Sequence, residues 1–413
     1  MKSYINKEII KYQLANLKQI TFEVTDSCNL RCKYCGYGEL YNDYDLRQNQ
    51  EISLPSAIKL LDYLVELWNS TYNQSTKQDV YISFYGGEPL LNMPFIYAIV
   101  DYIKNIDCPH RKFIFSMTTN AMFLEKNMDF LVSNNFSLLI SLDGNEYNTS
   151  YRINRVGKPV FHNILKNVDA LQAKYPDYFK QSVNFNAVLH NRNSVKEIYE
   201  FFKERYNKIP SIGELNNIGI RSDKIALFQN TYKNFNESLY QAENYEEIEQ
   251  GMFLRSVTYQ SITIFIHQYS GFVFKNYVDL LFGKPKKTIP TGTCVPFAKR
   301  LFMTVNGKIL PCERIGHHHA LGMVTDTVVT LDLDAVAERY NAYLNKLEKQ
   351  CSQCCNAAAC IQCIFNLHDL DGSPECSGFM NQQTFNIYKK RQMDFLREHP
   401  EEYYRIMEEV IIN

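Results

Sequence analysis

The sequence QITFEVTDSCNLRCKYC, residues 19–35, joins an apolar strand pattern to three closely spaced cysteines. Residues 19–25 are rich in aromatic and β-branched side chains, which predicts a buried strand. Cys28, Cys32 and Cys35 follow with the spacing C-x3-C-x2-C on the loop that leaves this strand. Three thiolates on one short loop can bind three irons of a [4Fe–4S] cluster and leave the fourth iron without a protein ligand. An open iron of this kind is able to bind and reduce a small molecule.

Zinc is the alternative metal for this loop. A structural zinc site is closed by four ligands, usually in C-x2-C pairs, and the loop offers three cysteines. Of the twelve cysteines in the chain, three lie here, one is Cys108, and eight fall between Cys294 and Cys376. This clustering favours ligation over scattered use as small core residues.

The length and composition describe a soluble globular protein. A chain of 413 residues is too long to fold around one hydrophobic core, which predicts two or three structural units. Hydrophobic residues make up 45% and charged residues 22%, and the net charge of −1 predicts neither nucleic-acid nor membrane binding. Residues 1–18 lack the apolar core of a signal peptide, and no run reaches the roughly 18 apolar residues of a membrane span. We therefore expect a cytoplasmic protein, whose cysteines are metal ligands or catalytic thiols rather than disulfides.

Outward from the first strand, short apolar runs alternate with helix-length amphipathic segments as far as residue 225. The alternation predicts six βα-like units and a parallel sheet with crossover helices. Six units are fewer than the eight of a closed barrel, so the expected fold is α/β, a partial, TIM-like (β/α)6 barrel with its chemistry at the carboxyl ends of the strands. The later strands are expected at 80–85, 112–118, 137–142, 182–189 and 217–221. The helices are expected at 53–67 with Ser53 as N-cap, and at 95–105, 125–133, 161–174 and 195–206.

The cysteine loop, with Tyr34 immediately before its last cysteine, resembles the signature of the radical S-adenosylmethionine superfamily. The resemblance implies S-adenosyl-L-methionine as cofactor, cleaved at the cluster to methionine and a 5′-deoxyadenosyl radical that abstracts a substrate hydrogen. It places Tyr34 among the residues at the cofactor and implies an external electron donor of the flavodoxin or ferredoxin type. The cofactors would supply the difficult chemistry, and the protein would supply position and electrostatics.

The segment GGEP at the end of the second predicted strand resembles the superfamily motif that holds the methionine amine. Its residues Gly86 and Gly87 let the backbone approach a ligand closely, and Glu88 can accept hydrogen bonds from an ammonium group. A Gly-Gly-Glu-Pro turn by itself is usually only a turn. Its place one strand after the cysteine loop favours the cofactor role.

Two polar segments follow the third and fourth predicted strands and resemble further cofactor-side motifs. Asn120 ends the sequence TTN, and Ser141 and Asp143 belong to SLDG. Hydroxyl, amide and carboxylate groups suit a ribose and an amino-acid carboxylate, while ordinary turn and capping chemistry is the alternative. Arg152 is expected to pair with the methionine carboxylate, because Arg binds carboxylates bidentately, and Arg155 is the alternative.

The C-terminal cysteines have a second recognisable spacing, which resembles the SPASM domain with its two auxiliary [4Fe–4S] clusters. With the first cluster this implies three clusters in all. In this family three residues precede the fourth cysteine of the central run, whereas two separate Cys360 from Cys363 here. Cys355 is an additional cysteine and the alternative ligand to Cys363, and a pair of zinc ribbons is the alternative fold.

The family's interleaved ligation implies two sets of auxiliary ligands. The nearer cluster would have three ligands and one open position, suited to a substrate thiolate. Glu313 follows Cys312, and in the related anaerobic sulfatase-maturating enzymes an acidic residue at this place acts as a base on the substrate. The same role is expected here, with a surface carboxylate as the alternative, and the adjacent histidines 317–319 are expected in an exposed loop. The ligands are Cys351, Cys354, Cys360 and Cys376 for the distant cluster, and Cys294, Cys312 and Cys363 for the nearer one.

The expected domains are a radical barrel at 1–225, a helical bridging region and linker at 226–290, a SPASM domain at 291–380 and a C-terminal helix at 381–413. Enzymes of this layout mostly modify peptides or proteins, and CKYCGYGELY most resembles the maturases of ribosomally synthesised peptides. The expected reaction is therefore a crosslink, a thioether, in a cysteine-containing precursor peptide.

About 18 residues precede the first strand, too few for a winged-helix leader-recognition domain. Leader binding is then expected in the bridging region, on the SPASM surface or on a separate partner protein. The alternatives are an anaerobic sulfatase-maturating enzyme, which forms formylglycine, and a non-catalytic zinc-binding interaction protein.

Overall fold

The chain folds into two compact units in a computed structural model that describes residues 2–74, 78–271, 273–274, 276–283 and 289–410. The sheet unit comprises Asn6–Tyr245 and Val295–Val336. The helical unit comprises Met1–Ile5, Glu246–Cys294 and Ala337–Asn413. The expected SPASM range, 291–380, therefore contributes residues to both units.

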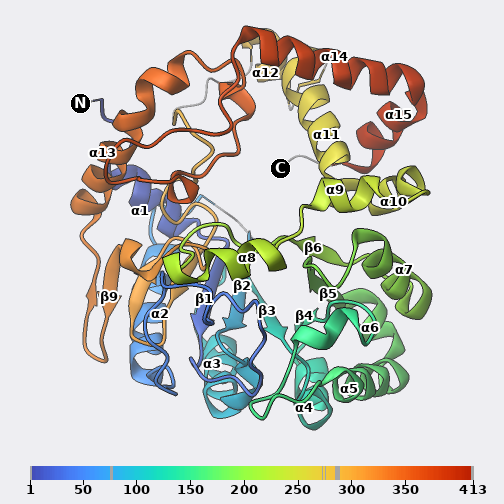
Figure 1. The fold of residues 1–413 in the computed structure, drawn as a ribbon. Coiled ribbons are helices and arrows are strands. Elements are labelled where there is room, and N and C mark those ends of the chain that lie inside the picture. The colour runs from blue at the N-terminus through green and yellow to red at the C-terminus, as the bar shows by residue number, and fades with distance from the viewer. Residues whose placement is uncertain (1, 75–77, 272, 275, 284–288, 411–413) are drawn as a thin grey trace. The chain divides into compact units, whose positions relative to one another are not determined.

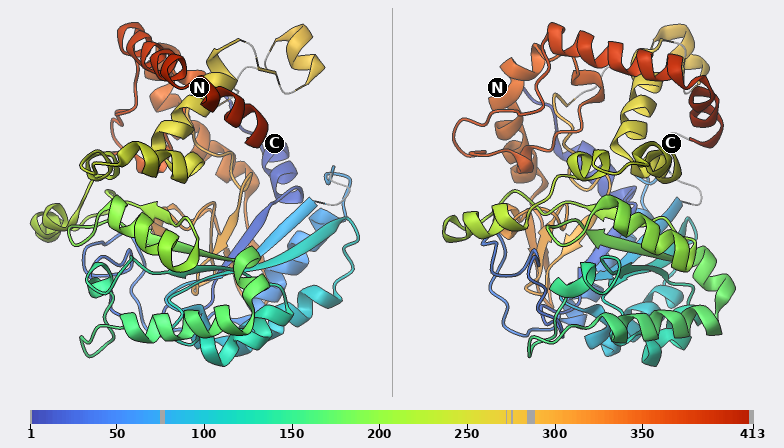
Figure 2. Two further views of the ribbon diagram at one scale, coloured as in Figure 1. Left: turned by 90° about the vertical axis from the view of Figure 1, so that its right-hand side faces the viewer. Right: turned by 45° about the vertical axis from the view of Figure 1, so that its right-hand side comes forward.

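A single ten-stranded sheet forms the sheet unit, in the order β10-β9-β8-β7-β1-β2-β3-β4-β5-β6. Strands β1 to β6 are parallel and neighbour one another in chain order, which confirms the predicted α/β fold with a parallel sheet. The helices between them lie outside the strands (Figures 1 and 2). The six strands are β1 (Gln19–Glu23), β2 (Gln78–Tyr85), β3 (Arg111–Thr119), β4 (Ser137–Ser141), β5 (Val183–Val188) and β6 (Ser211–Gly213).

The crossover helices follow the predicted positions closely. Ser53 caps α2 as expected, because its hydroxyl accepts a hydrogen bond from the backbone N–H of Ser56. Two helices have the predicted bounds, α5 and α7. The helices are α2 (Leu54–Trp68), α3 (Met93–Asn105), α4 (Leu124–Ser133), α5 (Phe161–Lys174) and α7 (Val195–Tyr206).

Strand β1 lies in the middle of the sheet and is buried on both faces. Ile20 and Phe22 are fully buried, and the Phe22 ring meets that of Phe95 on α3 edge to face at 5.9 Å. At the edge away from β2, β1 pairs in parallel with β7. From β7 the sheet continues through three antiparallel pairs, β7–β8, β8–β9 and β9–β10. These strands are β7 (Leu301–Met303), β8 (Lys308–Leu310), β9 (Gly322–Val324) and β10 (Val329–Thr330).

Three expectations about this unit need correction. The strand predicted at 217–221 is wrong: the last parallel strand is β6, and within 217–221 only Ile220 makes an isolated bridge, to Tyr41. Asn217, Gly219 and Arg221 leave only two apolar residues in this segment, so it does not sustain a ladder. Two helices were not predicted, α1 (Lys7–Ala15) and α6 (Pro176–Ser182), and α6 ends at Ser182, which the prediction gave to the next strand.

The region after β6 is helical, as expected for the bridging segment. The sheet unit contains α8 (Ile225–Thr231) and α9 (Phe235–Tyr240), and the helical unit contains α10 (Tyr245–Met252), α11 (Val257–Tyr269) and α12 (Tyr277–Phe282). Of the bridging region and linker expected at 226–290, residues 272, 275 and 284–288 lie outside the described residues.

The helical unit also holds most of α13 (Leu333–Ser352) and the C-terminal helices α14 (Gln382–Glu398) and α15 (Pro400–Glu409). A single helix was expected here, but Pro400 lacks an N–H to continue α14 and instead starts α15. The side chain of Ile406 on α15 is fully buried in a cluster with Ile262, Phe265 and Ile266 of α11. Across the described residues, no helix is both long and apolar enough to span a bilayer.

Candidate functional site

The cysteine loop packs against the turn that follows β2. The backbone N–H of Gly87 donates to the carbonyl of Thr25, and that of Glu88 donates to the carbonyl of Ser27, both at 2.9 Å. A Cβ atom on Gly87 would lie 1.9 Å from the Ser27 oxygen, and one on Gly86, at φ +130°, would lie 2.4 Å from the Thr25 oxygen. Glycine is therefore required twice in this turn, because only a chain without Cβ approaches the loop so closely.

The opposite side of the loop pairs with the segment 151–154. The N–H of Arg31 donates to the carbonyl of Ile153 at 2.7 Å, and the N–H of Lys33 donates to that of Tyr151 at 3.1 Å. Leu30 and Asn154 form an antiparallel bridge in the same register. The register sets Cys32 directly opposite Arg152.

The three cysteines of the loop are half-buried residues. Burial raises the pKa of Cys28 to about 11 and that of Cys32 to about 12, so a metal must stabilise the thiolates at neutral pH. Among the described residues, no group of three or more His, Cys, Asp or Glu is arranged to hold a single metal ion. A [4Fe–4S] cluster is a different case, since each cysteine binds its own iron, and three loop thiols fit that donor set.

Glu88 is a buried carboxylate at the carboxyl ends of β2 and β3. Its Oε1 accepts from the Thr119 hydroxyl at 2.6 Å and from the N–H of Leu90 at 3.1 Å, and its Oε2 accepts from the N–H of Asn120 at 2.7 Å. Burial raises the pKa of Glu88 to about 7, while these donors oppose the rise. The group therefore lies poised between its charged and neutral forms.

Asn120 connects this carboxylate to the cysteine loop. Its Nδ2 donates to Asn29 Oδ1 at 2.8 Å and lies 3.8 Å from Cys28 Sγ. Ser141 is the last residue of β4 at the same end of the sheet. The residues predicted to surround a cofactor thus come together at the carboxyl ends of neighbouring strands.

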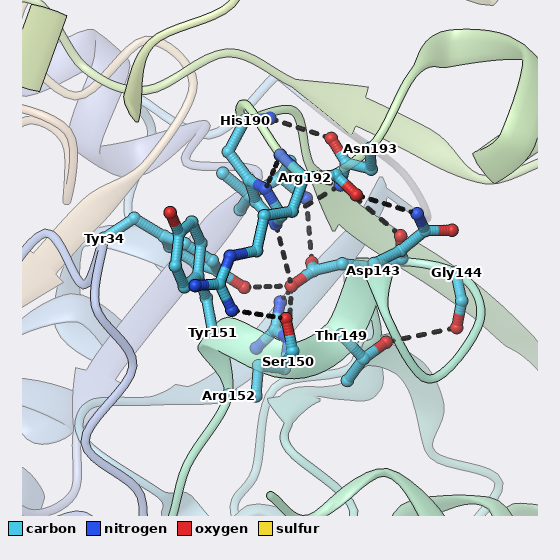
Figure 3. Close-up of polar contacts among 12 residues, drawn as sticks. Tyr34, Asp143, Gly144, Thr149, Ser150, Tyr151, Arg152, His190, Arg192 and Asn193 are labelled. Atoms are coloured by element: carbon cyan, nitrogen blue, oxygen red, sulfur yellow. Dashed lines mark hydrogen bonds and ion pairs between the residues drawn. The ribbon is translucent and has the colours of Figure 1, made fainter. Parts of the chain in front are cut away.

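Asp143 and Arg152 pair with each other, which corrects the separate roles expected for them. Arg152 Nε and Nη2 donate to the two Asp143 oxygens at 3.0 and 2.8 Å, and both residues are buried. The Tyr34 hydroxyl and the N–H of Val188 also donate to Asp143 (Figure 3). The guanidinium that was expected to bind the methionine carboxylate already holds a protein carboxylate. Arg155, the alternative, is exposed and its Nε donates to the carbonyl of Cys28 at 2.8 Å.

His190 joins this network and was not predicted from the sequence. Its ring is fully buried, stacks on Tyr34 at 5.4 Å between centroids, and lies beside Asp143 and Asn193 (Figure 3). Burial lowers the pKa of His190 to about 4, so the ring is neutral at pH 7. The only sequence signal was its position, two residues after β5, at the end of the sheet that carries the other groups.

Cys312 and Glu313 lie near the cysteine loop within the sheet unit. Burial raises the pKa of Tyr44 to about 12, and Cys35, Cys312 and Glu313 are close enough to raise it further. Glu313 and Cys35 act in the same direction on the pKa of the buried Tyr85 hydroxyl. Glu313 forms an ion pair with Arg300 and is largely shielded from solvent. The predicted base and a cysteine of the predicted first cluster loop therefore act electrostatically on the same two tyrosines.

The three histidines expected in an exposed loop form a short 3-10 helix, His317–His319. His317 and His319 are buried, and only His318 is exposed. The His317 ring packs edge to face on Tyr44 at 5.0 Å, and its Nδ1 lies 3.3 Å from Asp45. Aromatic packing against the loop tyrosines explains why this polar run is buried.

The remaining predicted ligands lie in the helical unit in two sets. Burial raises the pKa of Cys376, and Cys354 and Cys360 raise it further. Burial also raises the pKa of Cys363, and Cys294 raises that value further. Cys355 instead points to Gln382, whose Oε1 lies 3.5 Å from its sulfur. These groupings follow the predicted interleaving, in which Cys363 accompanies Cys294.

Comparison with known proteins finds a family match within the sheet unit. Residues 22–204 match the family model described as the Radical SAM superfamily. The structure "Native anSMEcpe with bound AdoMet" superposes with a TM-score of 0.60, covering 95% of this chain and 100% of that chain at 18% identity. The two proteins therefore share a fold.

Two curated relatives extend the similarity. The chain is 25% identical over 310 residues to a cysteine-type anaerobic sulfatase-maturating enzyme of Clostridium novyi, covering 73% of this chain and 74% of the relative. It is 26% identical over 227 residues to the radical SAM cyclopropyl synthase TigE of Paramaledivibacter caminithermalis, covering 53% and 44%. The chain thus spans less than half the length of the second relative.

We predict that Gly87→Ala detaches the cysteine loop from the turn after β2. The new methyl group meets a backbone oxygen, which cannot move like a flexible side chain, so the loop must shift. Iron retained after anaerobic reconstitution should fall several-fold, and the thermal midpoint should fall by about 2–4 °C for each kcal/mol lost. Gly213→Ala is the control, because nothing lies within 4 Å of its added Cβ. Equal iron content in the two variants would contradict the constraint.

We also predict that His190 makes folding depend on pH. Its pKa is about 4 in the folded chain and about 6.5 in the unfolded chain, so between these values the unfolded state binds an extra proton. The contribution of the neutral ring to the free energy of unfolding is fully present above about pH 6.5. It is lost as the pH is lowered from about 6.5 to about 4, by up to about 3 kcal/mol. Urea unfolding at several pH values should show a shallower pH slope for His190→Gln than for the native chain, and parallel slopes would count against the buried neutral ring.

Proposed function

We propose that this protein, whose residues 22–204 match the Radical SAM superfamily, modifies a peptide and installs a crosslink, a thioether, in it. The cluster and S-adenosyl-L-methionine, when bound, supply a carbon radical that removes a hydrogen atom from the substrate. The observation that carries the proposal is that Cys35, Cys312 and Glu313 all act electrostatically on Tyr44, whose ring packs edge to face on Tyr37 and His317. A radical source, a further thiolate ligand and a carboxylate then act on one substrate.

In this proposal Cys28, Cys32 and Cys35 bind the cluster. The cofactor lies along the carboxyl ends of β2 to β4, where the glycine turn leaves no side chain beside the loop. Glu88 accepts hydrogen bonds from the methionine ammonium. Arg155 binds the methionine carboxylate in place of Arg152, since it is exposed and already lies over the loop.

Asn120 and Ser141 then face the cofactor from β3 and β4. Their amide and hydroxyl groups match the hydrogen-bonding groups of a ribose. Tyr34 lies beside the cofactor, and its hydroxyl donates a hydrogen bond to the Asp143 carboxylate.

The crosslink requires that two electrons and two hydrogens leave the peptide. One hydrogen atom leaves a carbon and goes to the cofactor, and one proton leaves the cysteine thiol as the sulfur–carbon bond forms. An auxiliary cluster, held by the cysteines assigned below, would accept the remaining electron. Glu313 takes the thiol proton, and Arg300 holds its carboxylate in place.

The auxiliary clusters follow the cysteine groupings. We assign Cys351, Cys354, Cys360 and Cys376 to one cluster, supported by the influence of Cys354 and Cys360 on the pKa of Cys376. We assign Cys294, Cys312 and Cys363 to the other, with an open iron for the substrate thiolate, and the contact of Cys355 with Gln382 favours this choice. External one-electron donors of the ferredoxin or flavodoxin type and a separate leader-recognition protein are the proposed partners.

A second candidate is the conversion of a cysteine to formylglycine. The similarity to a cysteine-type sulfatase-maturating enzyme favours it, because it covers about three quarters of both chains. Glu313, immediately after Cys312, suits either reaction. The product distinguishes them: a crosslink loses only two hydrogens, whereas formylglycine formation also replaces sulfur by oxygen.

Co-expression with short cysteine-containing reading frames beside its gene, followed by mass spectrometry, tests the function. We expect a peptide lighter by two hydrogens that no longer reacts with a thiol reagent. Glu313→Gln should reduce product about 10²-fold while 5′-deoxyadenosine still forms, because the base acts after cofactor cleavage. Glu125→Gln is the control, since this glutamate on α4 is exposed and pairs with Lys166 instead of Arg300. Formylglycine in a Cys-x-Pro-x-Arg peptide selects the second candidate, and absence of 5′-deoxyadenosine from the native protein contradicts both.

We further predict that cofactor binding follows the ionisation of Glu88. The pKa of about 7 means that the carboxyl is mostly neutral below this pH and charged above it. The affinity for S-adenosyl-L-methionine should therefore rise about ten-fold from about pH 6 to about pH 8, and Glu88→Gln should abolish this dependence. Anaerobic equilibrium dialysis measures it, with Glu125→Gln, an exposed glutamate, as control. A native affinity that does not change with pH would remove Glu88 from the amine site.

A further inference from the structure

Asp143 is the centre of a buried network whose purpose the proposed function does not explain. Four hydrogen bonds reach its carboxylate, two from Arg152 and one each from Tyr34 and Val188. Its side chain is 0% exposed, and Arg152 is 5% exposed. Every strong acceptor position on the carboxylate is used inside the protein, so Asp143 acts on the protein and not on a ligand.

This ion pair lies directly behind the cysteine loop. The antiparallel bridge between Leu30 and Asn154, continued by the hydrogen bonds of Arg31 and Lys33, sets Cys32 opposite Arg152. Directly opposed residues in such a pair have Cα atoms about 4.5–5.5 Å apart. The guanidinium also lies 5.5 Å from the centre of the Tyr34 ring. Tyr34 lies between Cys32 and Cys35 in the sequence. A permanent charge pair is therefore placed next to Cys32, one of the three cluster cysteines.

The charge of Arg152 lowers the pKa of Cys32, against the effect of burial. Among the groups that act on the pKa of this thiol, Arg152 is the strongest one opposing the effect of burial, and Asp143 acts in the reverse direction. Both members of the pair thus influence the sulfur electrostatically, with opposite signs, across a buried and weakly polarisable region.

We propose that the Asp143–Arg152 pair positions the Tyr34 side of the loop and sets the reduction potential of the iron–sulfur cluster bound there. The inference rests on the proposed function, because it requires a cluster on Cys28, Cys32 and Cys35. Reduction adds one electron from an external low-potential donor to the cluster, so nearby positive charge favours the reduced form and negative charge the oxidised form. Paired, the two charges nearly cancel, and the cluster keeps the low potential that cofactor cleavage needs.

The two charges can be removed one at a time. Asp143→Asn leaves the guanidinium uncompensated, since arginine does not lose its proton in proteins, and should raise the potential. Arg152→Gln leaves the carboxylate and should lower it. The expected change is about ten-fold in the ratio of reduced to oxidised cluster at a fixed potential, about 59 mV for one electron. A purely structural role would loosen the loop in both variants and move both potentials in the same direction.

The experiment is an anaerobic redox titration of the full-length, reconstituted protein, followed by electron paramagnetic resonance. The signal that changes when S-adenosyl-L-methionine is added belongs to the cluster on the loop and separates it from the auxiliary clusters. Tyr34→Phe removes a hydrogen bond but no charge, and should shift the potential less than either charge variant. Asp169→Asn and Arg205→Gln are controls, because this ion pair between α5 and α7 is about 40% exposed and should leave the potential unchanged.

Opposite shifts in the two charge variants support the proposal, and equal potentials or shifts of one sign overturn it. Circular dichroism and iron content report whether each variant folds. If Asp143→Asn does not fold, Arg152→Gln decides alone, and a potential that is unchanged or raised overturns the proposal. A native protein that holds no cofactor-responsive cluster contradicts the proposed function instead, so the two failures are distinguishable.

Discussion

Backbone hydrogen bonds on two sides hold the cysteine loop, which contains no helix or strand of its own. One side is the turn after β2, where Gly87 must lack a Cβ for the Thr25 and Ser27 carbonyls to be reached. The other is the segment around Arg152. Everything proposed for the site depends on this double attachment, because three thiols bind one cluster only if the loop keeps its shape.

Most of the fold was predictable from the sequence because the parallel sheet leaves a strong pattern. Buried strands are continuous apolar runs, and the helices that cover them carry one apolar face, so α5 and α7 were located to the residue. The failures were short or interrupted elements. Strand β6 has three residues, too few for a periodicity to appear, and the C-terminal helix was predicted as continuous although Pro400 divides it.

The candidate site was predictable in its parts but not in its pairings. Cysteine spacing predicted the candidate metal ligands on one loop, and GGEP predicted a glycine turn with Glu88 beside that loop, because these motifs are local in the chain. Asp143 and Arg152 were also found, yet each was given a ligand of its own. The sequence contains no sign that they are buried together, and a buried charge must find its partner within the protein. His317 was misjudged for the same reason, since its burial depends on tyrosines almost 300 residues earlier in the chain.

The position of β1 has a consequence for synthesis on the ribosome. β1 is made first, yet its second neighbour is β7, and Ile20 does not meet Leu301 until most of the chain has emerged. Until then a strand with fully buried Ile20 and Phe22 has one unpaired edge, the kind of surface on which nascent chains associate wrongly. Truncation anywhere before residue 301 would leave that edge open for good, so a fragment containing only the six parallel strands would have β1 as an exposed edge strand without its native neighbour β7.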